Sequence, residues 1–559
     1  MNRRIRILAI LILALFLNYQ LITVLTSSSA SYNFKQQVDE PYVWIWEELA
    51  NSPSSISGDD VVFWGESLGP YHNYTELNDK LILLNSNFPE LVDVFSIGKT
   101  WHGRDILCVR LTNESVTSAK TEYYIVGQHH AREMISVENS LYFIDRIIYD
   151  SVFGSYLELL SSTELYIIPS LNPDGLSIMH WFPEQRKNVR PIDDDEDGTI
   201  DSDSDGFLDD EMERIYSWDH FANTSEIIEQ DLDGDTLIAE DLPGGVDLNR
   251  NYGAYWNGTG SSPDKDSPLY RGETPFSENE TQSLRDFMKQ HSFNFAVSLH
   301  SGIKAIIAPW GHNVTLPIKD EQEFNALLAQ IQSVVPFPLW NESGGYATNG
   351  VWDDYCYSYH DIMSFTFETY EAPWTGSYFD YYNPSGAGIL SNCELVFPGL
   401  VYLASNPHLT FSNNMPSVEV KNPSTENQVF EGYTIEWTMS DQDGDALNSS
   451  VFASSDGYHW DSLATNLIDE TSFYWNVTEV TPGSYYLKVA VSDSKDRIAD
   501  TSEIRLNVKQ EPPRSPFAFW ILAVIIGTLG AVFLFFNLRK SKAASKVWGP
   551  DPYEEARKD

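Results

Sequence analysis

Cysteine is scarce in this chain of 559 residues, which contains only Cys108, Cys356 and Cys393. Three cysteines cannot form a disulfide framework, although one pair could form, and their spacing suggests no zinc knuckle. Basic residues are also few, because 35 Lys and Arg stand against 81 Asp and Glu, a formal net charge of −46. This balance argues against nucleic-acid binding, which needs a basic surface. The negative charge fits either solubility in a salty exterior or steering of a substrate.

Long apolar runs are confined to the two ends of the chain. Residues 1–30 combine a basic start, an apolar run over 7–25 and the small residues Ser28-Ser-Ala30, which predicts a cleaved signal peptide, with an uncleaved anchor as the alternative. Residues 517–538 carry no charge and are long enough to span a bilayer as one transmembrane helix. Basic residues follow it and place the tail, 539–559, in the cytoplasm. We therefore expect a single-pass cell-membrane protein with its other domains outside the cell.

The residue pattern changes several times between these two ends. Residues 31–65 form an uninformative N-terminal segment, and residues 66–410 alternate strand and helix patterns, which predicts an α/β sheet with helices on both faces. Residues 414–509 change to short alternating strands, which predicts an immunoglobulin-like β-sandwich whose simplest role is a spacer. Its expected core aromatics are Trp437, Trp460 and Trp475. Nine N-x-S/T sequons, among them Asn73, Asn257 and Asn476, suit an exported glycoprotein.

Three polar groups end or follow apolar strand patterns. His130 and Glu133 lie between the β-rich run 123–127 and a helical pattern over 135–148. Such a pair can coordinate a metal ion, or it can belong to a solvated face of a helix. His300 ends the apolar strand 293–300, where a histidine is often only a polar cap. Because ligands gather at the carboxyl edge of α/β sheets, we expect these side chains to meet there.

Six short segments occur in a characteristic order, and together they resemble the zinc carboxypeptidases of the carboxypeptidase A/B type. The resemblance runs from about Tyr71 to about Asn406. The segments are His130-Ala-Arg-Glu133, Asn172-Pro-Asp-Gly175, Arg186-Lys-Asn188, Gly245-Val-Asp-Leu-Asn-Arg-Asn251, Ser298-Leu-His-Ser301 and Ser364-Phe-Thr-Phe-Glu368. The resemblance implies a mixed-sheet domain and one Zn²⁺ per chain, held by His130, Glu133 and His300 with water in the fourth position. His129 is not expected to be a ligand.

The resemblance also implies catalytic roles for two residues. Glu368 corresponds to the general base, which takes a proton from a water whose pKa the zinc lowers toward about 7 and passes it to the leaving amine. Arg186 corresponds to the arginine that stabilises the developing oxyanion. Without the resemblance, Glu368 would read as a salt-bridge partner and Arg186 as a surface residue.

Substrate contacts follow from the same resemblance. Asn249 and Arg250 correspond to the clamp for the free α-carboxylate, which a planar guanidinium can hold with two hydrogen bonds. Arg132 corresponds to a secondary-subsite arginine and Tyr346 to the mobile tyrosine that closes over substrate. Gly302 stands where digestive relatives often have tyrosine, so we expect different outer subsites.

Asp353 lies seven positions after Tyr346, at the place that sets the side-chain pocket in this family. A buried carboxylate there favours Lys or Arg as the residue removed and penalises an apolar one. The alternative is that Asp353 faces water while Trp352 and Tyr355 define an apolar pocket.

An acidic insert, residues 191–244, interrupts the α/β pattern between two of the six segments. Between Asp193 and Asp241 it holds 20 acidic residues and one basic residue, Arg214. Alternating carboxylates on tight Gly turns converge on hard cations, so we expect Ca²⁺ there, with a disordered acidic loop as the alternative. The expected calcium ligands are Asp201, Asp203, Asp205, Asp209, Asp231, Asp233 and Asp235.

These features predict a membrane-tethered, extracellular zinc metallocarboxypeptidase that removes single residues from peptide or protein C-termini. One alternative is a hydrolase of the same fold that acts on cell-wall or other non-standard peptides, which would have less need for a carboxylate clamp. The other is an inactive, calcium-dependent surface binding protein, against which the complete set of ligands, base and clamp argues.

Overall fold

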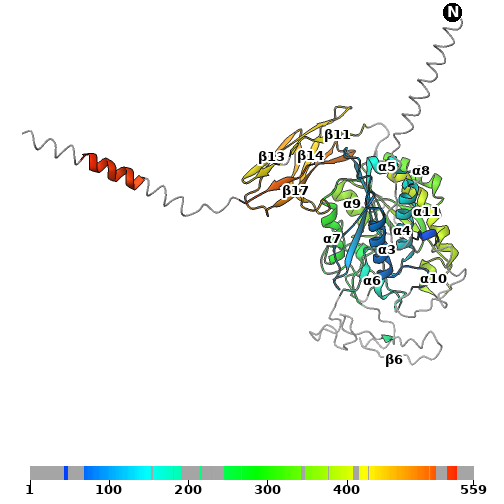
Figure 1. The fold of residues 1–559 in the computed structure, drawn as a ribbon. Coiled ribbons are helices and arrows are strands. Elements are labelled where there is room, and N and C mark those ends of the chain that lie inside the picture. Colours follow the sequence, from blue (N-terminus) through cyan, green and yellow to red (C-terminus); the bar gives the residue numbers. More distant parts are fainter. Residues whose placement is uncertain are drawn as a thin grey trace, which may run out of the picture.

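The structure of the chain is a computed structural model (Figure 1). It describes residues 43–47, 68–152, 155–180, 182–190, 214–215, 228–229, 244–265, 267–313, 315–316, 318–340, 347–375, 377–406, 414–425, 427–502, 504–510 and 526–537. The predicted signal peptide, most of residues 31–65, almost all of the acidic insert with its seven expected calcium ligands, and the tail lie outside the described residues.

Residues 68–406 form an α/β domain on an eight-stranded mixed sheet, in the order β1-β2-β4-β3-β7-β10-β8-β9. The strands are β1 (Val92–Lys99), β2 (Asp105–Leu111), β3 (Thr121–Gly127), β4 (Thr163–Ile168), β7 (Phe293–His300), β8 (Lys304–Ile307), β9 (Leu339–Trp340) and β10 (Met363–Thr369). The helices are α3 (Tyr74–Asn87), α4 (Ile135–Val152), α5 (Leu157–Ser162), α6 (Pro173–Ile178), η3 (Leu248–Arg250), α7 (Asn279–Met288), α8 (Glu321–Val334), α9 (Trp352–His360), α10 (Tyr378–Tyr382) and α11 (Ala387–Ser405). The short strands β5 (Arg214–Ile215) and β6 (Ile228–Glu229) pair with each other.

The centre of this sheet is parallel. Strands β4, β3, β7 and β10 run in one direction, so their carboxyl ends meet at one edge. Strands β3 and β7 are buried along their whole length, which explains why they read as nearly continuous apolar runs. The edge where they end is therefore where His130 and His300 are brought together.

Helices cover both faces of the sheet, as predicted. On one face Ile125 and Val297 belong to a core shared with α4, α8 and α11. On the other face Tyr124 and Ala296 pack with α7 and α9. Because side chains alternate along a strand, the same alternation places Ser298 and His300 on the face that α7 and α9 cover. Figure 1 shows these helices around the sheet.

The buried elements match the sequence predictions more closely than the edges do. Strand β7 has the predicted bounds, and α4 begins at Ile135 as predicted and continues to Val152. The edge strand β1 was not predicted. All three cysteines are buried free thiols, so none forms the pair that the sequence allowed.

Residues 414–510 form two β-sheets around one apolar core, in agreement with the predicted β-sandwich; the immunoglobulin-like assignment stays a prediction. The sheets are β11-β13-β16 and β12-β19-β17-β14-β15, with β18 paired to β17. Trp437 and Trp475 lie in the shared core, but Trp460 packs with Phe452 outside it. The strands are β11 (Ser417–Val420), β12 (Gln428–Val429), β13 (Gly432–Ser440), β14 (Asn448–Ser454), β15 (Asp461–Ile468), β16 (Ser472–Asn476), β17 (Gly483–Ser492), β18 (Arg497–Thr501) and β19 (Leu506–Val508).

Two segments bear on the membrane prediction. Among the described residues, only Tyr378–Ser405 is long and apolar enough to cross a bilayer by length and composition. It contains α11, which packs against α4 and α8, so it belongs to the core of the domain. The predicted span 517–538 is described over Ile526–Asn537, an apolar helix. Its assignment to a membrane stays a prediction.

The sequon asparagines differ in environment. Asn73 is buried and caps α3, because its side chain accepts a hydrogen bond from the Glu76 N–H. An attached glycan would have to emerge from this buried side chain. Asn257 and Asn476 are exposed, so the expectation of glycosylation applies better to these two positions.

Candidate active site

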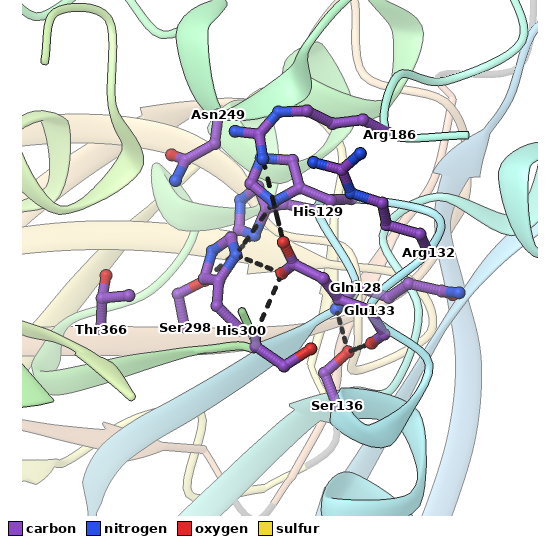
Figure 2. A network of polar contacts seen from close by, with 12 residues as sticks. Gln128, His129, Arg132, Glu133, Ser136, Arg186, Asn249, Ser298, His300 and Thr366 are labelled. Atoms are coloured by element: carbon purple, nitrogen blue, oxygen red, sulfur yellow. Dashed lines mark hydrogen bonds and ion pairs between the residues drawn. The ribbon is translucent and has the colours of Figure 1, made fainter. Parts of the chain in front are cut away.

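A buried cluster of two histidines and one glutamate lies at the carboxyl edge of the sheet. Its candidate ligand atoms lie within 4.8 Å of one another. The Nδ1 atoms of His130 and His300 lie 2.7 Å and 2.8 Å from the two Glu133 oxygens and 3.2 Å from each other. Figure 2 shows the Glu133 carboxylate between His300 and Arg186. The structure thus brings together the three side chains that the sequence predicted as metal ligands.

The donor set fits a zinc ion. Ligands 2.0–2.2 Å from a tetrahedral zinc are separated by roughly 3.3–3.6 Å. The donor atoms here lie 2.7–3.2 Å apart, so a small outward shift of the side chains would accommodate the ion. Burial alone would raise the pKa of Glu133, but the two imidazoles lower it well below its usual value. Three acceptor groups that face one another inside a protein are best satisfied by a shared cation, and this site could hold one.

The turn after β3 aims His130 at this cluster. Gln128 adopts a left-handed φ of 52°, and its backbone N–H donates to the Ser136 Oγ at 3.0 Å. A Cβ on Gly127 would lie 2.5 Å from the Pro169 carbonyl oxygen, so only glycine fits there. This close approach is what lets the chain leave the strand directly beneath the site.

His129 is buried beside the cluster but its nitrogens face elsewhere. Nε2 lies 2.8 Å from the Tyr252 hydroxyl and Nδ1 lies 3.0 Å from the Ser298 Oγ. Burial lowers its pKa well below the usual value, which keeps the ring neutral. Its ring stacks on that of His300. His129 therefore supports His300 and lies outside the donor set, as expected.

Asp247 is a functional residue that the sequence reasoning did not assign. Its Oδ1 lies 3.1 Å from Nε2 of His130, the ring nitrogen turned away from the cluster, and its Oδ2 accepts from Arg186 Nε at 2.9 Å. Metal-binding histidines commonly use their second nitrogen in this way. Asp247 belongs to the segment Gly245–Asn251, which resembles the family. An acidic residue two positions before Asn249 was therefore the sequence signal that could have identified it.

Arg186 approaches the cluster from the loop after α6. Its guanidinium is mostly buried, with Nε on Asp247 and Nη1 3.9 Å from the Glu133 carboxylate. Burial alone would lower its pKa, but these two carboxylates raise it. A fixed positive charge therefore borders the site, where it could stabilise negative charge that develops on a bound carbonyl oxygen.

Glu368 lies on β10 directly beside His300 in the parallel pairing of β10 with β7. Loss of hydration, followed by repulsion from Glu133, raises the pKa of Glu368 to about 7. Its Oε2 atom is buried and makes no hydrogen bond to the described residues. A carboxyl group with this pKa and an unused oxygen is suited to proton transfer at neutral pH.

The predicted carboxylate clamp borders the same site. Asn249 is oriented through its Oδ1, which accepts from the Trp352 N–H at 2.9 Å. Arg250 is buried and donates to the carbonyl oxygens of Gly260 and Asn249 at 2.7 Å and 2.6 Å. Tyr346 lies outside the described residues, so its role stays a prediction.

Asp353 is buried in the first turn of α9. Its Oδ2 lies 3.5 Å from the Thr366 Oγ1, on the face of β10 that also carries Glu368. Burial and the neighbouring charge of Asp354 raise its pKa to about 7. No Lys, Arg or His of the described residues forms an ion pair with it, whereas Asp354 pairs with His312 at 2.7 Å. Asp353 thus does not face water.

The alternative was an apolar pocket defined by Trp352 and Tyr355. Trp352 is fully buried, and its ring contacts Tyr124 and His129 edge-on, so it belongs to the core beneath the site.

A tyrosine that sequence reasoning missed packs beside Gly302. The Arg132 guanidinium lies over the Tyr382 ring at 4.3 Å from its centroid. A Cβ on Gly302 would lie 2.5 Å from that ring, and Gly302 has a φ of 124°, which only glycine adopts readily. Tyr382 therefore occupies space that a side chain at position 302 would need.

Sequence comparisons place the chain among known proteins. A zinc carboxypeptidase family profile matches residues 77–380. Carboxypeptidase B of Astacus astacus is 28% identical over 261 residues, covering 46% of this chain and 69% of the relative. Zinc carboxypeptidase A 1 of Drosophila melanogaster is 26% identical over 355 residues, covering 59% and 69%. Human carboxypeptidase A1 is 25% identical over 307 residues, covering 53% and 62%.

Solved structures with a similar α/β domain include bovine thrombin-activatable fibrinolysis inhibitor in complex with tick carboxypeptidase inhibitor. It has a TM-score of 0.45 and 21% identity, with 60% of this chain and 97% of that chain covered. Carboxypeptidase A from Helicoverpa armigera has a TM-score of 0.46 and 22% identity, with 64% and 76% covered. With its family profile spanning more than half of its length, the chain belongs to the zinc carboxypeptidase family.

Proposed function

We propose that this chain is a membrane-tethered, outward-facing zinc carboxypeptidase that removes single residues from the C-termini of peptides. The observation that carries the proposal is the buried cluster His130, Glu133 and His300, with Glu368 in the neighbouring strand position. The Asn249 and Arg250 pair beside it supports removal of terminal residues, because such an enzyme must recognise a free α-carboxylate. The apolar helix Ile526–Asn537 and the basic residues after it support the tether.

The chemistry divides among the chain's own residues. When bound, zinc supplies a Lewis acid and lowers the pKa of a coordinated water. Glu368 accepts a proton and returns it to the leaving amine, so peptide cleavage needs no free proton from solvent. Arg186 stabilises negative charge on the carbonyl oxygen, and its bond to Asp247 keeps the guanidinium in place. Asn249 and Arg250 hold the terminal carboxylate, which fixes the scissile bond in reach.

A C-terminal ladder experiment tests this function. Peptides of mixed sequence are incubated with the full chain, and the products are read by mass spectrometry. We expect successive loss of single C-terminal residues, and no reaction with C-terminally amidated peptides, which lack the carboxylate. Cleavage of amidated or cell-wall-type peptides, or cleavage of nothing, would contradict the proposal.

Metal binding gives an independent prediction. His300→Ala should lose its bound zinc, because two protein ligands no longer hold the ion at catalytic affinity. The measurement is zinc per chain by mass spectrometry after dialysis. The control is His102→Ala, a histidine outside the cluster whose ring lies against the Val189 carbonyl, and it should retain one zinc per chain. Equal zinc content in the two variants would remove His300 from the site.

Asp247→Asn should weaken zinc binding by about 10- to 100-fold, because the amide no longer accepts a full charge-assisted hydrogen bond from His130. Competition with a chelator measures the affinity. Asp79→Asn, at an exposed position of α3, serves as the control and should bind zinc normally. Unchanged affinity in Asp247→Asn would show that its bond to His130 is only structural.

Glu368→Gln keeps the size of the side chain but cannot transfer the proton. We expect kcat to fall by at least about 10²-fold while zinc stays bound. The matched control is Glu371→Gln, three residues further along the chain and exposed, which should retain wild-type turnover. Near-normal turnover in Glu368→Gln would exclude it as the base.

The residue removed is proposed to be Lys or Arg. Asp353 is a buried carboxylate that forms no ion pair with the described residues, which favours a cationic guest. For matched peptides that end in Arg, Lys, Leu and Phe, kcat/KM should favour the basic residues. In Asp353→Asn this preference should shrink by at least about 10-fold. A preference for Leu or Phe that the substitution leaves unchanged would contradict the assignment.

Calcium binding by the acidic insert stays a proposal on the spacing of its carboxylates alone.

A further inference from the structure

Part of the outer face of the sheet that contains β14 and β17 is buried against the α/β domain. Along β17, Leu487 and Val489 point into the sandwich core, while Lys488 and Ala490 point to the opposite face and are also buried. Phe452 and Trp460 share this second face. The outer face of an antiparallel sheet normally meets water and is polar. Here a lysine stands among aromatic side chains, and the α/β domain covers them.

Lys488 enters a polar network that belongs to the α/β domain. Its ammonium donates to the Gln290 carbonyl at 2.8 Å and lies 3.4 Å from the Glu122 carboxylate. The same carboxylate contacts His291 Nδ1 at 2.9 Å and accepts from the Ser292 N–H. Burial alone would raise the pKa of Glu122, but Lys488 and His291 lower it to about 2. The ammonium also lies over the Trp460 ring, 4.6 Å from its centroid.

Glu122 and its neighbours lie at the starts of two central strands. Glu122 is the second residue of β3, and His291 and Ser292 immediately precede β7. Just before β3, the Lys120 backbone exchanges two hydrogen bonds with Ala499 of β18, at 2.9 Å and 3.1 Å. The sandwich therefore extends main-chain pairing to the start of β3.

A bulge at the start of β7 is held by the sandwich as well. The pairing of β3 with β7 shifts between Glu122–Phe293 and Tyr123–Phe295, which leaves Asn294 without a partner across the sheet. The Asn294 side chain instead exchanges hydrogen bonds with the Arg497 backbone, at 2.8 Å and 3.0 Å. The Arg497 guanidinium donates to the Phe293 carbonyl at 2.9 Å. Strand register decides which face each residue meets, so this contact bears on where His300 points.

We propose that the β-sandwich is an integral part of the peptidase, docked through Lys488 and Arg497 on the starts of β3 and β7, and that it unfolds together with the α/β domain. The two strands it holds are those whose opposite ends lead to His130 and His300. This role replaces that of an independent spacer. It does not depend on the proposed substrate or on zinc binding.

Replacing Lys488 provides the first test. Lys488→Met keeps the length of the side chain but leaves Glu122 buried with less charge compensation, an arrangement that costs far more than the loss of a surface ion pair. The full chain is heated in detergent and unfolding is followed by tryptophan fluorescence. We expect the temperature of unfolding to fall by about 5 °C or more. Adding Glu122→Gln to Lys488→Met should recover part of the loss, because the lone buried charge is then removed.

The matched control is Lys421→Met in the same sandwich. Lys421 is exposed and pairs only with the exposed Glu419 in the described structure, so its loss should shift the temperature by less than about 1 °C. Equal shifts for Lys421→Met and Lys488→Met would overturn the proposal.

A second measurement uses the unaltered chain and decides the matter even if Lys488→Met does not fold. Hydrogen exchange in increasing denaturant, read by mass spectrometry, reports when each strand loses protection. Peptides from β17 and from β3 and β7 should lose protection at the same denaturant concentration. Loss of protection in β17 while β3 and β7 remain protected would show an independent domain and overturn the proposal.

Discussion

Charge buried at one edge of the sheet constrains the structure around it. A carboxylate in a protein interior is stable only when cations or hydrogen-bond donors surround it, because the water it loses is not otherwise replaced. Glu133 lies between His130 and His300, and Asp247 lies between His130 and Arg186. These five residues come from four separate segments of the chain. The parallel strands, the turn at Gln128 and the loop after α6 must therefore all be in place before the site exists.

The same constraint separates three carboxyl groups by environment. Glu133 contacts two imidazoles that lower its pKa, whereas Glu368 and Asp353 form no ion pair among the described residues, and burial raises the pKa of each to about 7. Environment thus distinguishes the group proposed to hold a cation from the group proposed to move protons and the group proposed to receive a side chain. No feature of the residues themselves makes this distinction, since all three are simple carboxyl groups.

The sequence predicted the centre of the fold and most residues of the candidate site, because both leave local signals. Strand β7 is an apolar run that ends in His300, and its bounds were predicted correctly. The three donors and Glu368 stand in segments that resemble a known family. Edge strand β1 was missed because its burial pattern is irregular. Asp247 was missed because its partner His130 is remote in sequence, and only the folded chain shows the contact. Lys488 likewise has the pattern of an ordinary outward residue of a strand. Trp460 was predicted for the sandwich core, but it packs in a separate cluster, because a strand pattern does not show which neighbouring domain covers its outer face.

The docked sandwich and the metal-binding edge lie at opposite ends of the same two strands. Strand β7 has eight residues, so about 26 Å of rigid strand separates the two ends. Figure 1 shows the sandwich seated at one end of the α/β domain. A solid support, a tag or an antibody attached to the sandwich would therefore be held away from the edge that carries His130 and His300. The sandwich is therefore the suitable attachment site for immobilising this enzyme.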